Sequence, residues 1–215
     1  MNGRPRFLTF EGGEGAGKST QIRLMADWLA AKGIDVLLTR EPGGSPGAEL
    51  IRDLLLKGAV DRWLPISEAL MLAAARADHI ERTIRPALKA GKWVLCDRFY
   101  DSSVAYQGAG RGVGVTEVQT IQKIAFGDMR PDLTLILDLP VDIGLKRALA
   151  REGEKSDMED RFERMERSFH ETLRQAFLSI AEAETDRCVV VNADQGIEQL
   201  QQQLRGIVTD RSLLS

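Results

Sequence analysis

The segment Gly12–Thr20 combines glycines, a lysine and hydroxyl side chains at a spacing suited to phosphate binding. The eight residues from Gly12 to Ser19 read GGEGAGKS and fit the pattern G-x-x-x-x-G-K-[ST] at every position. Glycines let the backbone curl with its N–H groups facing a phosphate, and a helix N-terminus behind them favours negative charge. We predict that Lys18 reaches the β- and γ-phosphates of a bound triphosphate and that the Ser19 hydroxyl ligates Mg²⁺.

The residues around this segment fit a loop between a strand and a helix. Residues 7–10 are apolar and β-prone, and they lead directly into the glycines. The helix is expected to begin at about Lys18, and residues 21–32 have apolar side chains at helical spacing, followed by Gly33. This context supports a nucleoside triphosphate site rather than a glycine-rich turn with a chance Lys-Ser pair. The loop residues predicted to bind ATP are Gly12, Gly13, Glu14, Gly15, Ala16, Gly17, Lys18, Ser19 and Thr20.

Short apolar runs alternate with helical patterns along the rest of the chain. The runs are continuous in apolar residues, as is typical of strands buried on both faces. We therefore predict an α/β fold with a five-stranded parallel sheet flanked by helices, in a single domain over residues 1–215. Further strands are expected at 36–39, 93–96, 133–139 and 188–191, and helices at 48–57, 67–90 with an interruption near Pro86, 116–126, 141–151, 161–184 and 197–208.

Composition and charge exclude several function classes. The 215 residues carry a net charge of −3 with a pI near 5.6, which argues against a nucleic-acid or membrane-surface binder. No apolar run approaches the roughly 20 residues of a membrane span, and the first residues lack the apolar core of a secretory signal. Cys96 and Cys188 lie in apolar runs and are expected to be buried free thiols. We expect a cytoplasmic protein.

A triphosphate site alone leaves a kinase, a GTPase switch and an ATPase motor module open. A GTPase needs an Asn-Lys-x-Asp guanine reader after a strand, but Asn192, the only asparagine beyond Asn2, is followed by Ala-Asp. A motor module usually belongs to a longer chain with arginines that face its oligomer partners. The sequence favours a small-molecule kinase.

Five blocks, spread in order along the chain, resemble the bacterial thymidylate kinase family. Arg-Glu-Pro-Gly-Gly and Asp-Arg-…-Ser-x-x-Ala-Tyr-Gln-Gly are much more diagnostic than the phosphate loop. The resemblance implies transfer of the γ-phosphoryl group of ATP to dTMP with Mg²⁺, on the nucleoside monophosphate kinase fold, in a homodimer built from helix faces. Another nucleoside or nucleotide kinase, or a regulatory nucleotide-binding protein of this loop type, stays as an alternative. The blocks are FEG at 10–12, TREPGG at 39–44, DRFYDSS at 97–103, AYQG at 105–108 and RPDLT at 130–134.

Three arginines on separate elements are candidates to hold the acceptor. A nucleoside monophosphate carries about two negative charges, which forked guanidinium donors match well. The resemblance implies that Arg76 and Arg98 hold the acceptor and its phosphate, with Arg52 beside them. Glu14 is unusual inside a phosphate loop, because phosphates repel a carboxylate; a sugar hydroxyl is a suitable partner. In the resembling family this position meets the acceptor's 3′-hydroxyl.

The remaining acceptor residues lie in the other family blocks. Ser103 and Gln107 are expected to hydrogen-bond the thymine edge, and Tyr106 to form a flat wall against the deoxyribose that disfavours a 2′-hydroxyl. Leu72 stands where many family members have a stacking phenylalanine, a loss of about 1 kcal/mol. Glu41 and Pro42 complete the predicted acceptor site. Asp97 ends the strand at 93–96, the position of the acidic residue that touches Mg²⁺ directly or through water.

A cation must neutralise the moving phosphoryl group, and the phosphate loop lacks one at Gly15, where some family members have an arginine. The bacterial arrangement implies a lid over about residues 147–161 that carries the catalytic arginine. We assign that role to Arg151 and packing against adenine to Arg147, with Arg161 as the alternative for either task.

No side chain of the sequence is arranged as a covalent nucleophile, and the acceptor phosphate is itself a nucleophile. His79 and His170 lie in helical segments with polar neighbours, so we expect both to be surface or packing histidines.

Overall fold

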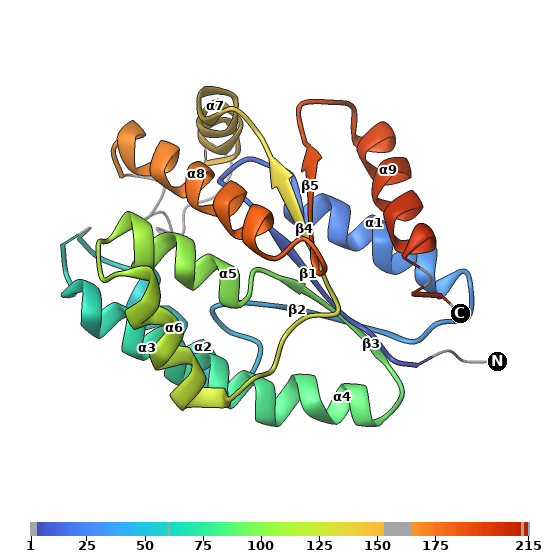
Figure 1. Cartoon of the computed structure of the whole chain (residues 1–215), viewed down its shortest axis with the longest axis horizontal. Coiled ribbons are helices and arrows are strands. Elements are labelled where there is room, and N and C mark those ends of the chain that lie inside the picture. The colour runs from blue at the N-terminus through green and yellow to red at the C-terminus, as the bar shows by residue number, and fades with distance from the viewer. Residues whose placement is uncertain (1–3, 60, 153–164, 212, 215) are drawn as a thin grey trace.

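A five-stranded, entirely parallel sheet forms the centre of the molecule, in the order β2-β3-β1-β4-β5 (Figure 1). The computed structural model describes residues 4–59, 61–211 without 153–164, and 213–214; for residues 151 and 152 it describes the backbone only. All five predicted strands are present, and the predicted fold class is confirmed. Their bounds are β1 Phe7–Glu11, β2 Val36–Arg40, β3 Trp93–Asp97, β4 Leu133–Asp138 and β5 Cys188–Asn192.

Helices cover both faces of the sheet (Figure 1). On one face, α1 and α9 pack side by side over a core that includes Met25 and Leu204. On the other face, the central helices pack around Phe99 and Val104, and α8 packs around Phe177. The bounds are α1 Lys18–Ala30, α2 Pro46–Leu56, α3 Pro65–His79, η1 Ile80–Ile84, α4 Arg85–Lys89, α5 Tyr100–Ser103, η2 Val104–Gly110, α6 Val115–Phe126, α7 Val141–Glu152, α8 Arg167–Ala183 and α9 Ile197–Asp210.

The helix predicted at 67–90 is three consecutive segments. A π-helical stretch, η1, separates α3 from α4, and Pro86 lies in the first turn of α4, directly after this stretch. The predicted interruption is confirmed. The helix predicted at 161–184 is wrong at its start: residues 165 and 166 are not helical, and residues 161–164 lie outside the described part of the chain.

Helices α5 and η2, which run from Tyr100 to Gly110, are not predicted by the sequence pattern. This segment is buried on both sides, with apolar residues toward the core and polar residues toward a cavity. The usual contrast between an apolar face and a solvent face is therefore absent. π-Helical turns such as η2 are rare and occur frequently at functional sites.

The sheet order brings the chemistry-bearing loops together. Strands β1 and β3 are direct neighbours, so the glycine loop after β1 and residues Asp97 and Arg98 at the end of β3 emerge side by side. In open α/β sheets, ligands bind at the carboxyl ends of the strands, where the chain turns to opposite faces. A buried ion pair between Asp101 and Arg187, with atoms 2.7 Å apart, ties α5 to the start of β5 behind this edge.

Candidate active site

The backbone of the glycine loop binds the side chain of Lys18. Gly17, with a φ of 87°, caps α1, and Lys18 is the first residue of that helix. The Lys18 ammonium donates to the carbonyls of Gly12 at 3.1 Å and Gly13 at 2.8 Å. Burial, followed by repulsion from Arg98, lowers the pKa of Lys18 from 10.5 to about 8. The side chain is still mostly protonated at neutral pH and suits a phosphate ligand.

Ala16 differs from the other loop residues predicted to bind ATP, because its side chain belongs to the hydrophobic core. Only 1% of Ala16 is exposed, and its methyl group lies in the apolar cluster that also contains Ile22 and Met25 of α1. The prediction that Ala16 contacts ATP therefore concerns its backbone rather than its side chain. This side chain anchors the loop to the core, so that Ala16 has only its backbone N–H to offer a phosphate.

Gly15 contacts α7 so closely that only glycine fits there. A Cβ added to Gly15 would lie 2.1 Å from the carbonyl oxygen of Gly144, and one added to Gly144 would lie 2.4 Å from the carbonyl oxygen of Glu14. Gly15 also has a φ of 68°, in the left-handed region that favours glycine. The loop of this chain therefore has no room for an arginine at position 15.

Ser19 and Asp97 form the predicted magnesium position. The Ser19 hydroxyl donates to Asp97 Oδ2 over 2.7 Å. Within the described residues, no group of three or more His, Cys, Asp or Glu side chains forms a metal cage. Mg²⁺ takes hard oxygen ligands, uses one or two protein side chains and completes its shell with water and substrate phosphates. A hydroxyl and a carboxylate beside the phosphate loop fit that preference.

A cavity of about 260 Å³ opens beside the glycine loop. All ten residues predicted to bind the acceptor line it, and so do Ser19 and Asp97. Five further lining residues were not predicted, although three of them lie inside the family blocks at 39–44 and 97–103. The ten are Glu14, Glu41, Pro42, Arg52, Leu72, Arg76, Arg98, Ser103, Tyr106 and Gln107, and the five are Arg40, Leu55, Leu56, Phe99 and Ser102.

Glu14 and Arg98 form an ion pair at the boundary between the loop and the cavity. Arg98 Nη2 lies 2.7 Å from Glu14 Oε1, which also accepts the Tyr106 hydroxyl over 2.7 Å. Burial alone would raise the pKa of Glu14, but Arg98, Lys18 and the Tyr106 hydroxyl outweigh it and lower the pKa to about 2. Glu14 is therefore a fixed carboxylate acceptor within a phosphate loop.

Arg98 adopts a left-handed backbone conformation that its neighbours hold in place. Its φ is 66°, which is uncommon for a residue with a side chain. The buried Glu11 carboxylate accepts the next backbone N–H, that of Phe99, over 2.7 Å and the Ser102 hydroxyl over 2.6 Å. Burial, with repulsion from Asp101, raises the pKa of Glu11 to about 7. The sequence showed Glu11 only as part of a family block, without this role.

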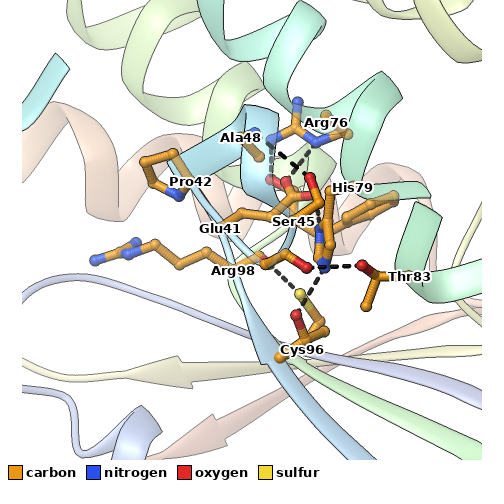
Figure 2. A network of polar contacts seen from close by, with 12 residues as sticks. Glu41, Pro42, Ser45, Ala48, Arg76, His79, Thr83, Cys96 and Arg98 are labelled. Carbon is orange, nitrogen blue, oxygen red and sulfur yellow. Dashed lines mark hydrogen bonds and ion pairs between the residues drawn. The ribbon is translucent and has the colours of Figure 1, made fainter. Parts of the chain in front are cut away.

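Figure 2 shows Glu41 bridging Arg76 and His79, and both Glu41 and Arg76 line the cavity. One carboxylate oxygen accepts Arg76 Nε over 2.6 Å, and the other lies 2.9 Å from His79 Nδ1. The second ring nitrogen of His79 lies 2.7 Å from the Thr39 hydroxyl. The expectation of a surface or packing histidine is half right: His79 is fully buried, but as part of a polar network.

Arg76 uses four of its five N–H bonds on the protein. Besides Glu41, it donates to the Ser103 hydroxyl at 2.9 Å, to Gln122 Oε1 at 2.7 Å and to the Phe99 carbonyl at 2.9 Å. Since Nε and Nη1 are fully used, the remaining N–H is on Nη2. Arg76 is thus a buried side chain with one N–H that no residue in the described part of the chain accepts.

Arg147 on α7 lies close to the turn after β5. Its Nη1 donates to the Ala193 carbonyl over 3.4 Å, and Nη2 lies 3.5 Å from Asp194 Oδ1. The side chain of Arg151, all of Arg161 and most of the expected lid lie outside the described residues.

Comparison with known proteins decides which kinase family the site belongs to. The family model described as thymidylate kinase matches residues 10–204. The chain belongs to the thymidylate kinase family. The thymidylate kinase of Caulobacter vibrioides is 54% identical over 205 residues, which cover 95% of this chain and 96% of that protein. The thymidylate kinase of Bradyrhizobium diazoefficiens is 51% identical over 212 residues, which cover 99% and 92%.

A solved structure agrees with the sequence relatives. The crystal structure of thymidylate kinase from Ehrlichia chaffeensis superposes with a TM-score of 0.76 at 32% identity, covering 95% of this chain and 98% of that one. The predicted resemblance is confirmed, and with it the phosphotransferase activity of a thymidylate kinase. Among the described residues of this chain, no helix is long and apolar enough to cross a membrane.

Proposed function

We propose that the cavity is the dTMP site and that the γ-phosphoryl group of ATP crosses from the glycine loop to the acceptor phosphate beside Glu14. The main support for this proposal is that one residue belongs to both sites: Glu14 is part of the donor loop and also lines the acceptor cavity. Donor and acceptor then meet without any element between them. Phosphoryl transfer requires mainly such positioning and neutralisation of charge.

The base edge would be read by Arg76 and Gln107. Gln107 Nε2 donates to Glu68 Oε1 over 2.8 Å, which leaves the amide oxygen as an acceptor. Arg76 offers one N–H on Nη2. One acceptor beside one donor complements the N3–H and C4 carbonyl of thymine. Leu72 would supply apolar contact with the ring in place of a stacked aromatic.

The acceptor sugar and phosphate would lie nearer the loop. Glu14 is suited to accept the 3′-hydroxyl, and Tyr106, which is held by Glu14 and by an edge-on contact with Phe169, would pack against the deoxyribose. Arg98 and Arg52 would pair with the phosphate, and Glu41 with Pro42 would form the wall beside them. The Pro42 carbonyl accepts Arg52 Nη1 over 2.7 Å, which supports this placement.

On the donor side, Lys18 and the N–H groups of residues 12–20 would hold the ATP phosphates. Ser19 and Asp97 would hold Mg²⁺, which neutralises phosphate charge when bound. Arg147 would pack against adenine, beside the turn that contains Ala193.

The catalytic cation is assigned to Arg151 rather than to the loop. The lack of room at Gly15 supports this, because an arginine there would collide with α7. Helical spacing gives further support: position 151 is two turns after Gly144, so it lies on the face of α7 that begins against the loop. Residues 147–161 would form the lid that brings this cation to the transferring group.

Replacing Arg52 by glutamine tests the acceptor site. We expect KM for dTMP to rise about 10- to 100-fold, because a hydrogen bond to a charged group is worth about 1.5–3 kcal/mol. KM for ATP should change less than about twofold. Initial rates with each substrate varied in turn provide the measurement. Arg82→Gln, which removes an exposed arginine paired with Asp78, is the matched control. An equal rise in KM for both substrates would contradict the assignment.

A homodimer through α2 and α3 is also proposed. These two helices pack against each other and, together with Leu64 directly before α3, carry five exposed large apolar residues, among them Leu50 at 70% and Leu70 at 52% exposure. Apolar side chains gathered in this way are typical of interaction surfaces. The five are Leu50, Leu54, Leu64, Ile66 and Leu70.

We expect Leu70→Lys to shift the protein from dimer to monomer in sedimentation velocity at micromolar concentration. A buried lysine without a partner destabilises an interface by several kcal/mol. Ile197→Lys, on α9 at the other face of the sheet, should leave the sedimentation coefficient unchanged. A wild-type monomer would disprove the homodimer, and loss of the dimer in the Ile197 variant would place the interface elsewhere.

The cytoplasm is the proposed compartment. Both cysteines are buried free thiols, as is usual where thiols are kept reduced. The net charge of −3 supports small-molecule substrates rather than nucleic acid as partners.

A further inference from the structure

We propose that Glu68 is a positioning residue that sets the base specificity of the acceptor site by fixing the orientation of the Gln107 amide. The inference rests on the proposed role of Gln107 at the base edge. Glu68 Oε1 accepts Gln107 Nε2–H over 2.8 Å, and both side chains are almost fully buried. The bond therefore lies in the wall of the cavity, where water competes little with it.

An amide has two chemically different ends of nearly the same shape. A turn of 180° about the last bond of Gln107 would exchange its acceptor and its donor toward a ligand. A carboxylate can only accept, so Glu68 selects the orientation in which the amide nitrogen faces it. The oxygen then points away from Glu68, and no described residue donates a hydrogen bond to it. Arg111 Nε, 3.8 Å from Glu68 Oε1, brings an opposite charge close to this buried carboxylate.

The position of Glu68 on α3 links it to the rest of the base pocket. Glu68, Leu72 and Arg76 are spaced four residues apart, so they lie on one face of the helix. Leu72 and Arg76 line the cavity, and Glu68 continues the same face one turn earlier. A single rigid helix therefore positions one base contact through Arg76 and the other through the Glu68–Gln107 bond.

The fixed amide oxygen discriminates between pyrimidines. Thymine and uracil present an N3–H donor beside the C4 carbonyl, which match the Gln107 oxygen and the Arg76 N–H. Cytosine presents an unprotonated N3 beside an amino group, so an acceptor would face an acceptor and a donor would face a donor. Such a mismatch in a buried site rejects the wrong ligand by repulsion as well as by lost bonds. Glu68 would thus separate dTMP from dCMP and not from dUMP.

The test compares kcat/KM for dTMP and for dCMP in the full-length enzyme. In Glu68→Gln, the new amide can present either end, so Gln107 can turn to suit cytosine. We expect the dTMP:dCMP ratio to fall at least about 10-fold. Glu68→Asp keeps an acceptor-only group at a shorter reach and should lower the ratio less. Thermal unfolding of each variant identifies the folded ones, and an unchanged ratio in the folded variants overturns the proposal.

Two further variants separate the explanations. Arg111→Gln removes the opposite charge but leaves the Glu68–Gln107 bond, so its ratio should stay within about twofold of wild type. A fall as large as that of Glu68→Gln would attribute the effect to charge and overturn the proposal. An equal loss for both acceptors in Glu68→Gln would show a merely structural role and would also overturn it.

Gln107→Leu tests the underlying function separately. If its ratio is unchanged, Gln107 does not read the base, and the proposed base contact fails together with the role of Glu68. If the ratio falls in Gln107→Leu but not in Glu68→Gln, the base contact stands and only the positioning role of Glu68 is overturned.

Discussion

Replacing Arg98 by alanine is expected to lower kcat/KM for dTMP by about 1,000-fold, within the range of arginines that neutralise a transferring phosphoryl group. Arg98 touches both halves of the site: it donates to the Gly12 carbonyl of the donor loop over 3.0 Å and to Glu14 over 2.7 Å. Its loss removes the proposed cation of the acceptor phosphate and the ion pair that holds Glu14. Steady-state rates over a matrix of ATP and dTMP concentrations provide the measurement.

Two further variants serve as comparisons for Arg98→Ala. Arg98→Lys keeps the positive charge but loses the forked donors of the guanidinium group. Its kcat/KM should lie between those of Arg98→Ala and wild type, because one ammonium cannot bond Gly12, Glu14 and a phosphate in the same geometry. Arg82→Ala removes a surface arginine and should keep wild-type kinetics. If Arg98→Ala retained more than about a tenth of wild-type kcat/KM, Arg98 would not be part of the transfer site.

Replacing Arg151 by alanine is expected to lower kcat by about 100-fold or more while KM for dTMP changes little, because the lost interaction forms mainly in the transition state. Gly15 carries no charge and has no room for one, so the loop offers no substitute at that position. Single-turnover measurements with saturating substrates separate this loss in the chemical step from slow product release.

Arg161→Ala is the matched comparison for Arg151, since both belong to the expected lid. The assignment predicts a much smaller loss of kcat for the Arg161 variant. The reverse order, with the larger loss in Arg161→Ala, would move the catalytic role to Arg161. Equal wild-type rates in both variants would contradict a catalytic arginine in the lid.

The sheet and the donor loop were predictable because their signals are local. Apolar runs such as 93–96 and 188–191 form strands of the parallel sheet, although only 93–96 is buried on both faces and Val190 in the edge strand β5 is exposed. The glycine pattern of residues 12–19 depends on backbone conformation at consecutive positions. The gathering of the predicted acceptor residues at one cavity followed from parallel strands that end at a common edge. The start of α8, the existence of α5 and η2, and the burial of the Ala16 side chain in the core were missed.

The buried polar residues around the site were harder to foresee. Glu68 reads as an ordinary acidic residue in the first turn of a helix, and His79 as an ordinary helical histidine. Their roles depend on partners 39 and 38 residues away, Gln107 for Glu68 and Glu41 for His79. No local pattern reports such contacts. Tertiary packing decides whether a charged side chain is solvated or buried against a partner.

The most direct test of the acceptor assignment is turnover with a panel of acceptors. ADP release, coupled to NADH oxidation, is measured with ATP and Mg²⁺ and with dTMP, dUMP, dCMP, dGMP or thymidine. We expect rapid turnover with dTMP, a much lower kcat/KM for dCMP and dGMP, and no turnover with thymidine, which lacks the phosphate that Arg52 and Arg98 are proposed to hold. Phosphorylation of thymidine without phosphorylation of dTMP would contradict the acceptor assignment.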